Sequence, residues 1–434
     1  MTSRLLKRTM TKNKLKNRLK IFNWTLFDFA NTSYSIVIVT FLFAVYFKET
    51  IAQGKPIGDF YWSLGISLSM LITGIISPIL GAISDYSAGK KRFLLFFTLL
   101  CITSSSLLYF TAPGMILVTL VLFVIANIGF EAGLVFYDAF LPEITEQKNY
   151  GRVSGYGFAM GYLGSLIILA ILFPLIQRGL IKETFPISAA FFLIFSLPIF
   201  LFIHDKKKKA FERVNYIKTG IDRVVFTISH IKNYKNLAYF LLAFFFYIEG
   251  VNTVIYFSGN YAKTTLNFSF MELAFFFIIV QSTAIFGSVI FGIISDSIGQ
   301  KKSIIISLVI WIFTMLIAYL SSAKDGFIID TFTDLFNCEK PTFYKGSFYL
   351  VGLIAGAVMG ATQSTSRSLM SKLTPDDKKT EFFGFYSLFG KSSAILGPLV
   401  FGLISYLTAN QRYGILSITF FFLTGMILLF RVKE

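Results

Sequence analysis

The sequence predicts an all-α polytopic membrane protein with twelve transmembrane helices, arranged as two pseudo-symmetric six-helix bundles. Hydrophobic residues make up 55% of the chain and charged residues only 15%, whereas soluble globular proteins carry about 25% charged residues. Apolar runs of about 20 residues, each long enough to cross a bilayer, recur along the whole length. A polar loop motif occurs twice, about half a chain apart, which indicates two related halves.

The twelve apolar runs define the expected elements. No segment between them is long enough for an independent soluble domain. The apolar run behind the basic start is too long for a signal-peptide core, so we interpret it as a retained first helix. We divide the chain into a basic tail at 1–20, a six-helix bundle at 21–203, an amphipathic linker at 204–236 and a second six-helix bundle at 237–434. The runs themselves cover residues 21–47, 61–83, 93–111, 115–137, 154–176, 185–203, 237–258, 271–294, 303–320, 347–366, 382–406 and 413–431.

The repeated loop lies between the second and third runs and between the eighth and ninth. Its copies read Gly81-Ala-Ile-Ser-Asp-Tyr-Ser-Ala-Gly-Lys-Lys-Arg92 and Gly292-Ile-Ile-Ser-Asp-Ser-Ile-Gly-Gln-Lys-Lys302. This small–acid–glycine–basic pattern resembles the signature loop of the major facilitator superfamily of secondary transporters. The resemblance implies that the acid at Asp85 pairs with nearby cations and an adjoining helix N-terminus, holding the cytoplasmic side shut. The candidate gating residues are Gly81, Asp85, Gly89, Lys91, Arg92, Asp296, Lys301 and Lys302.

The net charge of +17 maps to one side of the predicted membrane topology. Thirty of the forty Lys and Arg residues lie in the tail, the 204–236 linker and the loops of that side, and nine lie in the opposite loops. Because Lys and Arg accumulate in cytoplasmic loops, we expect both termini and the linker to be cytoplasmic and the protein to lie in the plasma (inner) membrane. Attraction to anionic lipid headgroups explains this charge better than nucleic-acid binding does.

The linker at 204–236 has the pattern of a basic amphipathic helix on the inner membrane surface. It begins with four lysines, Lys206 to Lys209. Its apolar residues recur at helical spacing, at Phe211, Val214, Ile217, Ile221, Val224, Val225 and Ile228. We interpret it as a tether between the halves, and a regulatory or partner role stays open.

Polar residues inside the apolar runs are the candidates for a solute site, because such residues are costly in a membrane and usually face a cavity. Asp28-x-x-Asn31-Thr in the first helix recurs as Glu249-x-x-Asn252-Thr in the first helix of the second half. The alternative for Asp28 is an interfacial, snorkelling side chain, and the same alternative holds for Lys391. The candidate substrate-binding and coupling residues are Asp28, Asn31, Asn127, Glu131, Glu249, Asn252, Gln281, Gln363, Arg367 and Lys391.

Within the superfamily the chain resembles the branch named for the vacuolar amino-acid effluxers of autophagy. The resemblance is carried by Asp28, Ala30, Asn31 and Tyr34; by Phe136, Tyr137, Leu141, Pro142, Glu143, Ser154, Gly155, Tyr156 and Gly157; and by Gln363, Ser366, Arg367, Ser368, Phe382, Phe383, Gly384, Tyr386, Gly390, Lys391, Gly397 and Pro398. Glu131 and Asp138 are departures, since the branch leads us to expect an amide at or near the first and Asn at the second. The extra carboxylates could add a cation or proton requirement.

These observations predict a secondary active transporter for a small polar solute. Acids and cations together suit a zwitterion such as an amino acid or small peptide. Gly384-x5-Gly390-Lys391-Ser has one residue too many for a phosphate-binding loop and lies in an apolar helix, so we expect an ion gradient as the energy source, with Glu249 carrying the proton and Asp28 in a substrate or gating role. We expect no cofactor, metal or nucleic acid, and a monomer. A transport-inactive sensor or scaffold is the alternative; an intramembrane enzyme is weaker, since the membrane region lacks histidine and a nucleophile–base pair.

Overall fold

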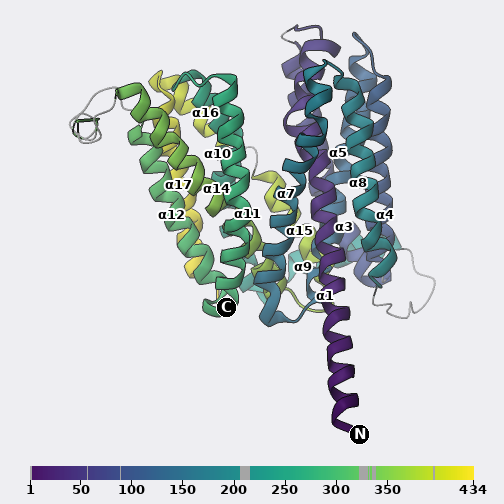
Figure 1. Ribbon diagram of the computed structural model, residues 1–434. Coiled ribbons are helices and arrows are strands. Elements are labelled where there is room, and N and C mark those ends of the chain that lie inside the picture. Colours follow the sequence, from purple (N-terminus) through teal and green to yellow (C-terminus); the bar gives the residue numbers. More distant parts are fainter. Residues whose placement is uncertain are drawn as a thin grey trace. The chain divides into compact units, whose positions relative to one another are not determined.

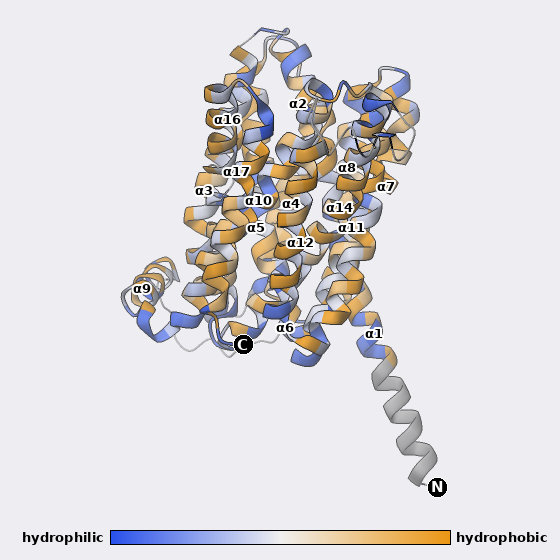
Figure 2. Cartoon of the chain, turned by 90° about the vertical axis from the view of Figure 1, so that its left-hand side faces the viewer, coloured by the Kyte–Doolittle hydropathy of each residue, from blue (hydrophilic) through white to orange (hydrophobic). Residues whose placement is uncertain are grey.

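The computed structural model describes the chain except residues 1, 56, 88, 206–215, 322–330, 332, 335–338 and 394–395, and it describes only the backbone of residues 2–14, 270 and 321. Within this part the chain is helical without strands, and twelve helices are long and apolar enough to cross a membrane (Figure 1). The predicted all-α, twelve-helix membrane architecture is therefore confirmed. Figure 2 shows apolar residues along the spans and polar residues gathered near their ends.

Contacts within the chain divide it into two compact units. Unit 1 comprises Met1–His230 and Thr374–Leu388, and unit 2 comprises Ile231–Leu373 and Phe389–Glu434. Residues 374–388 thus belong to unit 1, although they follow helices of unit 2 in the sequence. The boundaries of the linker, drawn at 204–236 from the sequence, stay a prediction.

Unit 1 contains the first six spans, the linker helix and the start of the eleventh span. Its elements are α1 (Thr2–Tyr34), η1 (Ser35–Thr40), α2 (Leu42–Tyr46), η2 (Phe47–Ile51), α3 (Ile57–Ser87), α4 (Lys90–Leu107), η3 (Leu108–Phe110), α5 (Ile116–Asp138), α6 (Leu141–Ile144), η4 (Gln147–Asn149), α7 (Tyr150–Gln177), α8 (Ile181–Phe202), α9 (Tyr216–Ser229) and the part of α15 (Lys379–Ser392) that ends at Leu388.

Unit 2 contains the remaining spans. Its elements are η5 (Ile231–Tyr234), α10 (Lys235–Thr264), α11 (Phe270–Ile298), α12 (Gln300–Ser321), α14 (Lys340–Leu373), the end of α15, α16 (Leu396–Thr408) and α17 (Gln411–Phe430). Most helices extend several residues beyond the apolar runs, as α14 does beyond the predicted 347–366. Hydropathy misses these turns because they carry Lys, Ser and Thr.

The first span departs from the single regular helix predicted at 21–47. The α-helix ends at Tyr34, and the π-helical turns η1 and η2 flank the short helix α2. The segment of η1 reads Ser35-Ile-Val-Ile-Val-Thr40. Its β-branched side chains are restricted at χ1 and have low helix propensity, which explains why the regular helix stops here.

The eleventh span, predicted as one run at 382–406, consists of two helices. Helix α15 ends at Ser392 and α16 begins at Leu396. Pro398 lies in the first turn of α16, where its missing N–H removes no intrahelical hydrogen bond. Ser393 lies in a turn after α15, and residues 394 and 395 are outside the described part of the chain.

Glycines allow close helix contacts within each unit. In unit 1, Thr32 Oγ1 on α1 donates to the backbone oxygen of Gly161 on α7 at 2.8 Å, and a methyl group at Gly164 would lie 2.9 Å from the backbone carbon of Phe29. In unit 2, a methyl group at Gly360 of α14 would lie 3.0 Å from Ser288 N on α11. Side chains at these positions would force the helices apart.

Candidate functional site

Unit 1 contains a buried polar cluster on α1, α3 and α5. Asp28 and Asn31 are both buried, and Asn31 Nδ2 lies 3.4 Å from Asp28 Oδ1. Asn127 on α5 donates to Ser69 Oγ on α3 at 2.8 Å and accepts from the Tyr34 hydroxyl at 3.5 Å. The structure thus joins the predicted pair on α1 to each other and Asn127 to both α1 and α3.

Glu131 is also buried, one helical turn after Asn127 on α5. Spacing of four residues places both side chains on one face of that helix. Asp28 is buried among the helices of unit 1. Two carboxylates, two amides and several hydroxyls therefore lie inside the helices of unit 1, and such groups can bind a polar solute that donates hydrogen bonds.

Unit 2 has a corresponding cluster where α10 meets the start of α16. Glu249 is fully buried, and its Oε1 accepts a hydrogen bond from the backbone N–H of Gly397. Among the described residues, its other oxygen, Oε2, has no hydrogen-bond partner. One turn along α10, Asn252 Nδ2 donates to Ser393 Oγ at 3.3 Å. Both members of the predicted pair thus face the break in the eleventh span.

Gly397 is required for this arrangement. A methyl group on its Cα would lie 2.8 Å from Glu249 Oε1 and 3.1 Å from Glu249 Cγ. The absence of a side chain lets the carboxylate reach the first turn of α16, where backbone N–H groups lack intrahelical partners and the helix end is electropositive. The Glu249 carboxylate is consequently hydrogen-bonded to the backbone of α16.

The remaining candidates lie elsewhere in unit 2. Gln281 is half-buried on α11, and its Oε1 has no hydrogen-bond partner among the described residues. Gln363 is half-buried and Arg367 buried on α14, one turn apart. Next to Arg367, Ser366 Oγ is 2.7 Å from the Tyr247 hydroxyl of α10. Lys391 is half-buried in the last turn of α15.

The first signature loop holds the N-terminus of α15. Asp85 Oδ1 accepts from Thr380 Oγ1 at 2.7 Å, and its Oδ2 accepts from the backbone N–H of Glu381 at 2.9 Å. Gly81 lies against the backbone of the same turn, where a methyl group would approach the Thr380 carbonyl carbon to 2.6 Å. The expected helix N-terminus is thus present beside Asp85. No Lys or Arg of the described residues forms an ion pair with Asp85, but the positive charge of Lys90 is near enough to favour the ionised carboxylate.

The basic end of this loop bonds to neighbouring segments of unit 1. Gly89 precedes α4, and the buried Lys90 forms an ion pair with Glu143 of α6. Lys91 donates from Nζ to the Ile203 carbonyl at 2.8 Å and from its backbone N–H to Asp205 Oδ2 at 3.0 Å. Burial raises the pKa of the Asp205 carboxyl, and the hydrogen bond from Lys91 opposes that shift. Arg92 is exposed.

The second signature loop makes similar hydrogen bonds, with residues that follow α17. Glu434 accepts from the backbone N–H groups of Gln300 at 2.7 Å and Lys301 at 2.9 Å. Lys301 Nζ donates to the Val432 carbonyl at 2.7 Å, as Lys91 does to that of Ile203 in unit 1. Asp296 is half-buried and Lys302 exposed.

Sequence reasoning missed several charged residues that build these sites. Lys90 lies within the motif and Asp205 within the linker, and neither was chosen as a site residue, although Lys90 begins α4 and Asp205 follows α8. Glu381 is fully buried in the first turn of α15. The acid-rich first turn of a helix is a sequence signal for such a residue, but its burial requires the tertiary structure.

No group of His, Cys, Asp and Glu in the described residues could hold a metal ion. The arrangement contains two buried polar clusters, one in each unit and each with at least one carboxylate, and helix N-termini that donate to acids at the ends of spans. These features can bind and release small polar solutes and protons.

Comparisons with known proteins also indicate a transporter. The family model described as "Vacuole effluxer Atg22 like" matches residues 61–150 and 145–434. The chain is 31% identical over 432 residues to "Uncharacterized MFS-type transporter YxiO" of Bacillus subtilis, covering 95% of this chain and 94% of that protein. It is 24% identical to "Autophagy-related protein 22" of Coccidioides immitis, covering 84% of this chain and 70% of that protein.

Solved structures of transporters have the same fold. The human organic anion transporter MFSD10 (TETRAN) has a TM-score of 0.72 and 13% identity, covering 95% of this chain and 99% of that chain. The proton:xylose symporter XylE has a TM-score of 0.74 and 14% identity, covering 97% of each chain.

Proposed function

Because the chain belongs to the family described as vacuole effluxer Atg22 like, we propose that it is a proton-coupled secondary transporter that moves a small polar solute across the membrane by alternating access. The resemblance to the major facilitator superfamily, predicted from the signature loops, and to its vacuolar-effluxer branch, predicted from residues along the chain, is confirmed. The family and the fold are those of MFS-type transporters, not of enzymes.

The setting of Glu249 is the observation that carries the proposal. A buried carboxylate with only one oxygen hydrogen-bonded is costly to keep charged in a membrane. Glu249 has this setting, because Oε1 accepts from Gly397 N–H and Oε2 has no partner among the described residues. A proton on Oε2 would remove the charge, and the hydrogen bond to α16 would remain. Glu249 is therefore suited to bind a proton in one state and release it in another.

The solute that we propose is a zwitterion of the amino-acid or small-peptide class. Asp28 and Glu131 of unit 1 are acceptors for an ammonium group, and Asn31 and Asn127 can orient its neighbours. Arg367 is a buried cation in unit 2 and is suited to a carboxylate. The description of the family as an effluxer supports export, although the direction stays open in this proposal.

The test is solute counterflow in proteoliposomes. A thermal-shift screen of amino acids and small peptides first identifies stabilising ligands, since a ligand stabilises the state that binds it. The liposomes are then loaded with the unlabelled hit, and uptake of the labelled form is followed. We expect transient accumulation above equilibrium. Binding without any counterflow would instead support the transport-inactive sensor or scaffold.

A matched pair of variants connects this test to the site. Asp28→Asn removes a buried carboxylate of the unit 1 cluster. Asp59→Asn removes an exposed carboxylate in the first turn of α3, which pairs with Lys48 of η2. We expect counterflow to fall strongly in the first and to be unchanged in the second. Equal activity of the two variants would remove Asp28 from the proposed site.

A further inference from the structure

Buried charges connect the linker helix α9 to the start of α15 in unit 1. Glu381 is fully buried, and its carboxylate accepts a hydrogen bond from the Thr227 hydroxyl of α9. Lys378 Nζ lies 3.4 Å from Glu381 Oε1 and donates to Thr227 Oγ1 at 2.6 Å. Arg223 Nε lies 3.6 Å from Glu381 Oε2, and its Nη2 donates to the Asp377 carbonyl at 3.3 Å. One buried acid thus joins two helices through a hydroxyl and two cations.

This connection adjoins the signature loop directly. The backbone N–H of the same Glu381 donates to Asp85. Helix α9 also approaches α3 closely at Gly220, where a methyl group would lie 2.6 Å from Ile83 Cγ1 and 3.1 Å from the Ile79 carbonyl oxygen. A change in the position of α9 would therefore be felt at the contact between Asp85 and α15.

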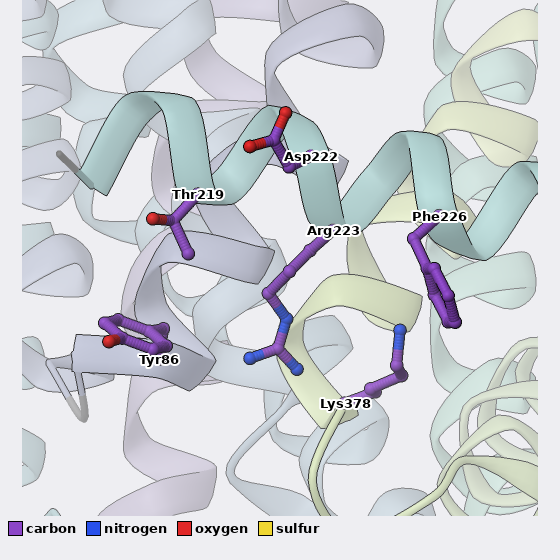
Figure 3. Close-up of a pocket in the computed structure, with 6 residues that line it drawn as sticks. All are labelled: Tyr86, Thr219, Asp222, Arg223, Phe226 and Lys378. Atoms are coloured by element: carbon purple, nitrogen blue, oxygen red, sulfur yellow. The ribbon is translucent and has the colours of Figure 1, made fainter. Parts of the chain in front are cut away.

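A pocket of about 440 Å³ lies beside this junction (Figure 3). Arg223 and Lys378 point into it from α9 and from the residue before α15, and Phe226 lies with its ring 5.7 Å from Lys378 Nζ. Both cations already contact Glu381, and Asp222 also lines the pocket, so the pocket offers little uncompensated charge to a ligand. The outer surface of α9 is therefore a better candidate for a binding surface than this pocket.

The outer face of α9 is apolar and exposed. Four apolar residues recur at intervals of four, four and three positions, which places them on one helix face: Ile217, Ile221, Val225 and Ile228. Their side chains are between 44% and 66% exposed. Lys218 and Asp222, also exposed, lie beside this row. A helix with one docked face and one exposed apolar face is expected to have a second binding partner.

The charge of the linker identifies the chemistry of that partner. Residues 204–236 contain nine Lys and Arg residues against three acids. An apolar helix face accompanied by basic residues is the composition that binds the interface of an anionic bilayer. We propose that α9 binds an anionic lipid leaflet through Ile217, Ile221, Val225 and Ile228, and that this binding holds the first turn of α15 against Asp85 through Glu381.

Binding is tested with a fluorophore whose emission depends on its environment. Val225→Cys on the apolar face, or Asp222→Cys on the polar side as matched control, is labelled with a nitrobenzoxadiazole reagent. Both are made in a Cys338→Ser background, in which the other cysteine, Cys101, is buried. The full chain is reconstituted in phosphatidylcholine vesicles with or without phosphatidylglycerol.

We expect phosphatidylglycerol to shift the emission at position 225 to the blue and to increase its quenching by lipids spin-labelled near the headgroup. The probe at 222 should change little. An equal response of the two probes overturns the proposed face. A response at 225 that does not depend on phosphatidylglycerol overturns the choice of an anionic lipid.

Coupling to α15 is tested by amide hydrogen exchange of residues 379–388 in the same vesicles. We expect slower exchange with phosphatidylglycerol in the unmodified protein and in Thr219→Val, and loss of that difference in Thr227→Val, which removes the hydroxyl that donates to Glu381. A lipid-dependent difference that persists in Thr227→Val overturns the coupling. Neither readout measures transport, so both stand apart from the proposed function.

Discussion

Glu249 and Asp28 show at the residue scale how one sequence pattern leads to two settings. Each is followed after three residues by Asn, and the sequence predicted that each pair shares a helix face. In α1 the Asn31 amide lies against Asp28 itself. In α10 Glu249 bonds to Gly397 and Asn252 to Ser393, at the break of the eleventh span. The pattern was readable from spacing, whereas its partners depend on tertiary contacts that no local pattern reports.

Gly397→Ala tests whether the carboxylate needs this close approach. The added methyl group would collide with Thr253 Oγ1 and would lie 2.8 Å from Glu249 Oε1, both on α10, so we expect a destabilisation of about 1–3 kcal/mol from overpacking and strongly reduced transport. Thermal unfolding and counterflow measure the two effects.

Gly402→Ala is the matched control, since it lies on the same helix and a methyl group there meets no atom within 4 Å among the described residues. We expect it to keep full transport and to gain up to about 1 kcal/mol from helix propensity. If Gly397→Ala kept the thermal stability and the counterflow of Gly402→Ala, transport would not depend on the close approach of Glu249 to α16.

At the scale of elements, apolar length predicted all twelve spans because it depends only on local composition. The irregular segments inside the first and eleventh spans were not predicted. The β-branched run Ser35–Thr40 and the pair Gly397-Pro398 are visible signals, yet hydropathy reads through both. The apolar periodicity predicted the helix of the linker, and α9 covers Tyr216–Ser229; the predicted Phe211 and Val214 lie outside the described residues. The contact of α9 with Glu381 joins residues 154 positions apart in the sequence. No local sequence pattern predicts such a contact.

Asp85→Asn tests the contact between α3 and α15. The amide keeps one oxygen acceptor but places an NH2 group against Thr380 or the Glu381 N–H, so we expect transport to slow while the protein still inserts. A charged hydrogen bond contributes about 1.5–3 kcal/mol. In a double-mutant cycle of thermal stability, Asp85→Asn and Thr380→Val should be strongly non-additive.

Asp296→Asn, at the same place in the second loop, is the matched control for this cycle. We expect it to show no coupling to Thr380→Val. Additive effects of Asp85→Asn and Thr380→Val, with normal transport, would contradict a gating role for Asp85.

At the scale of the whole molecule, the repeat extends further than the motif. In each copy a lysine of the signature loop donates to a backbone carbonyl that follows a later span: Lys91 to Ile203 after α8, and Lys301 to Val432 after α17. An acid beside that carbonyl accepts from the backbone N–H of the same lysine, in the first turn of α4 for Asp205 and of α12 for Glu434. The two loops also differ, because Gly299 has a φ of +96° and Gly89 a φ of −119°. Glycine is thus conformationally required in the second copy. The sequence repeat predicted the two-fold relation but not these capping acids.

The charge distribution predicts that both termini and the linker lie in the cytoplasm. Ser229→Cys in α9 and Lys55→Cys before α3 are exposed positions on the two predicted sides. In a Cys338→Ser background, an impermeant thiol reagent added to intact cells should label Lys55→Cys and not Ser229→Cys. Permeabilised cells, in which both should react, are the control. The reverse labelling pattern would contradict the orientation.

The central claim is that Glu249 couples transport to a proton. Glu249→Gln mimics the protonated acid, and its amide oxygen can still accept from Gly397, but it cannot release a proton. The most direct measurement compares solute exchange at equal pH with accumulation driven by a pH gradient, in the same proteoliposomes. We predict that Glu249→Gln keeps exchange and loses accumulation, while Glu272→Gln, at a half-buried acid in the first turn of α11, keeps both. Accumulation by Glu249→Gln in response to the pH gradient would contradict the account.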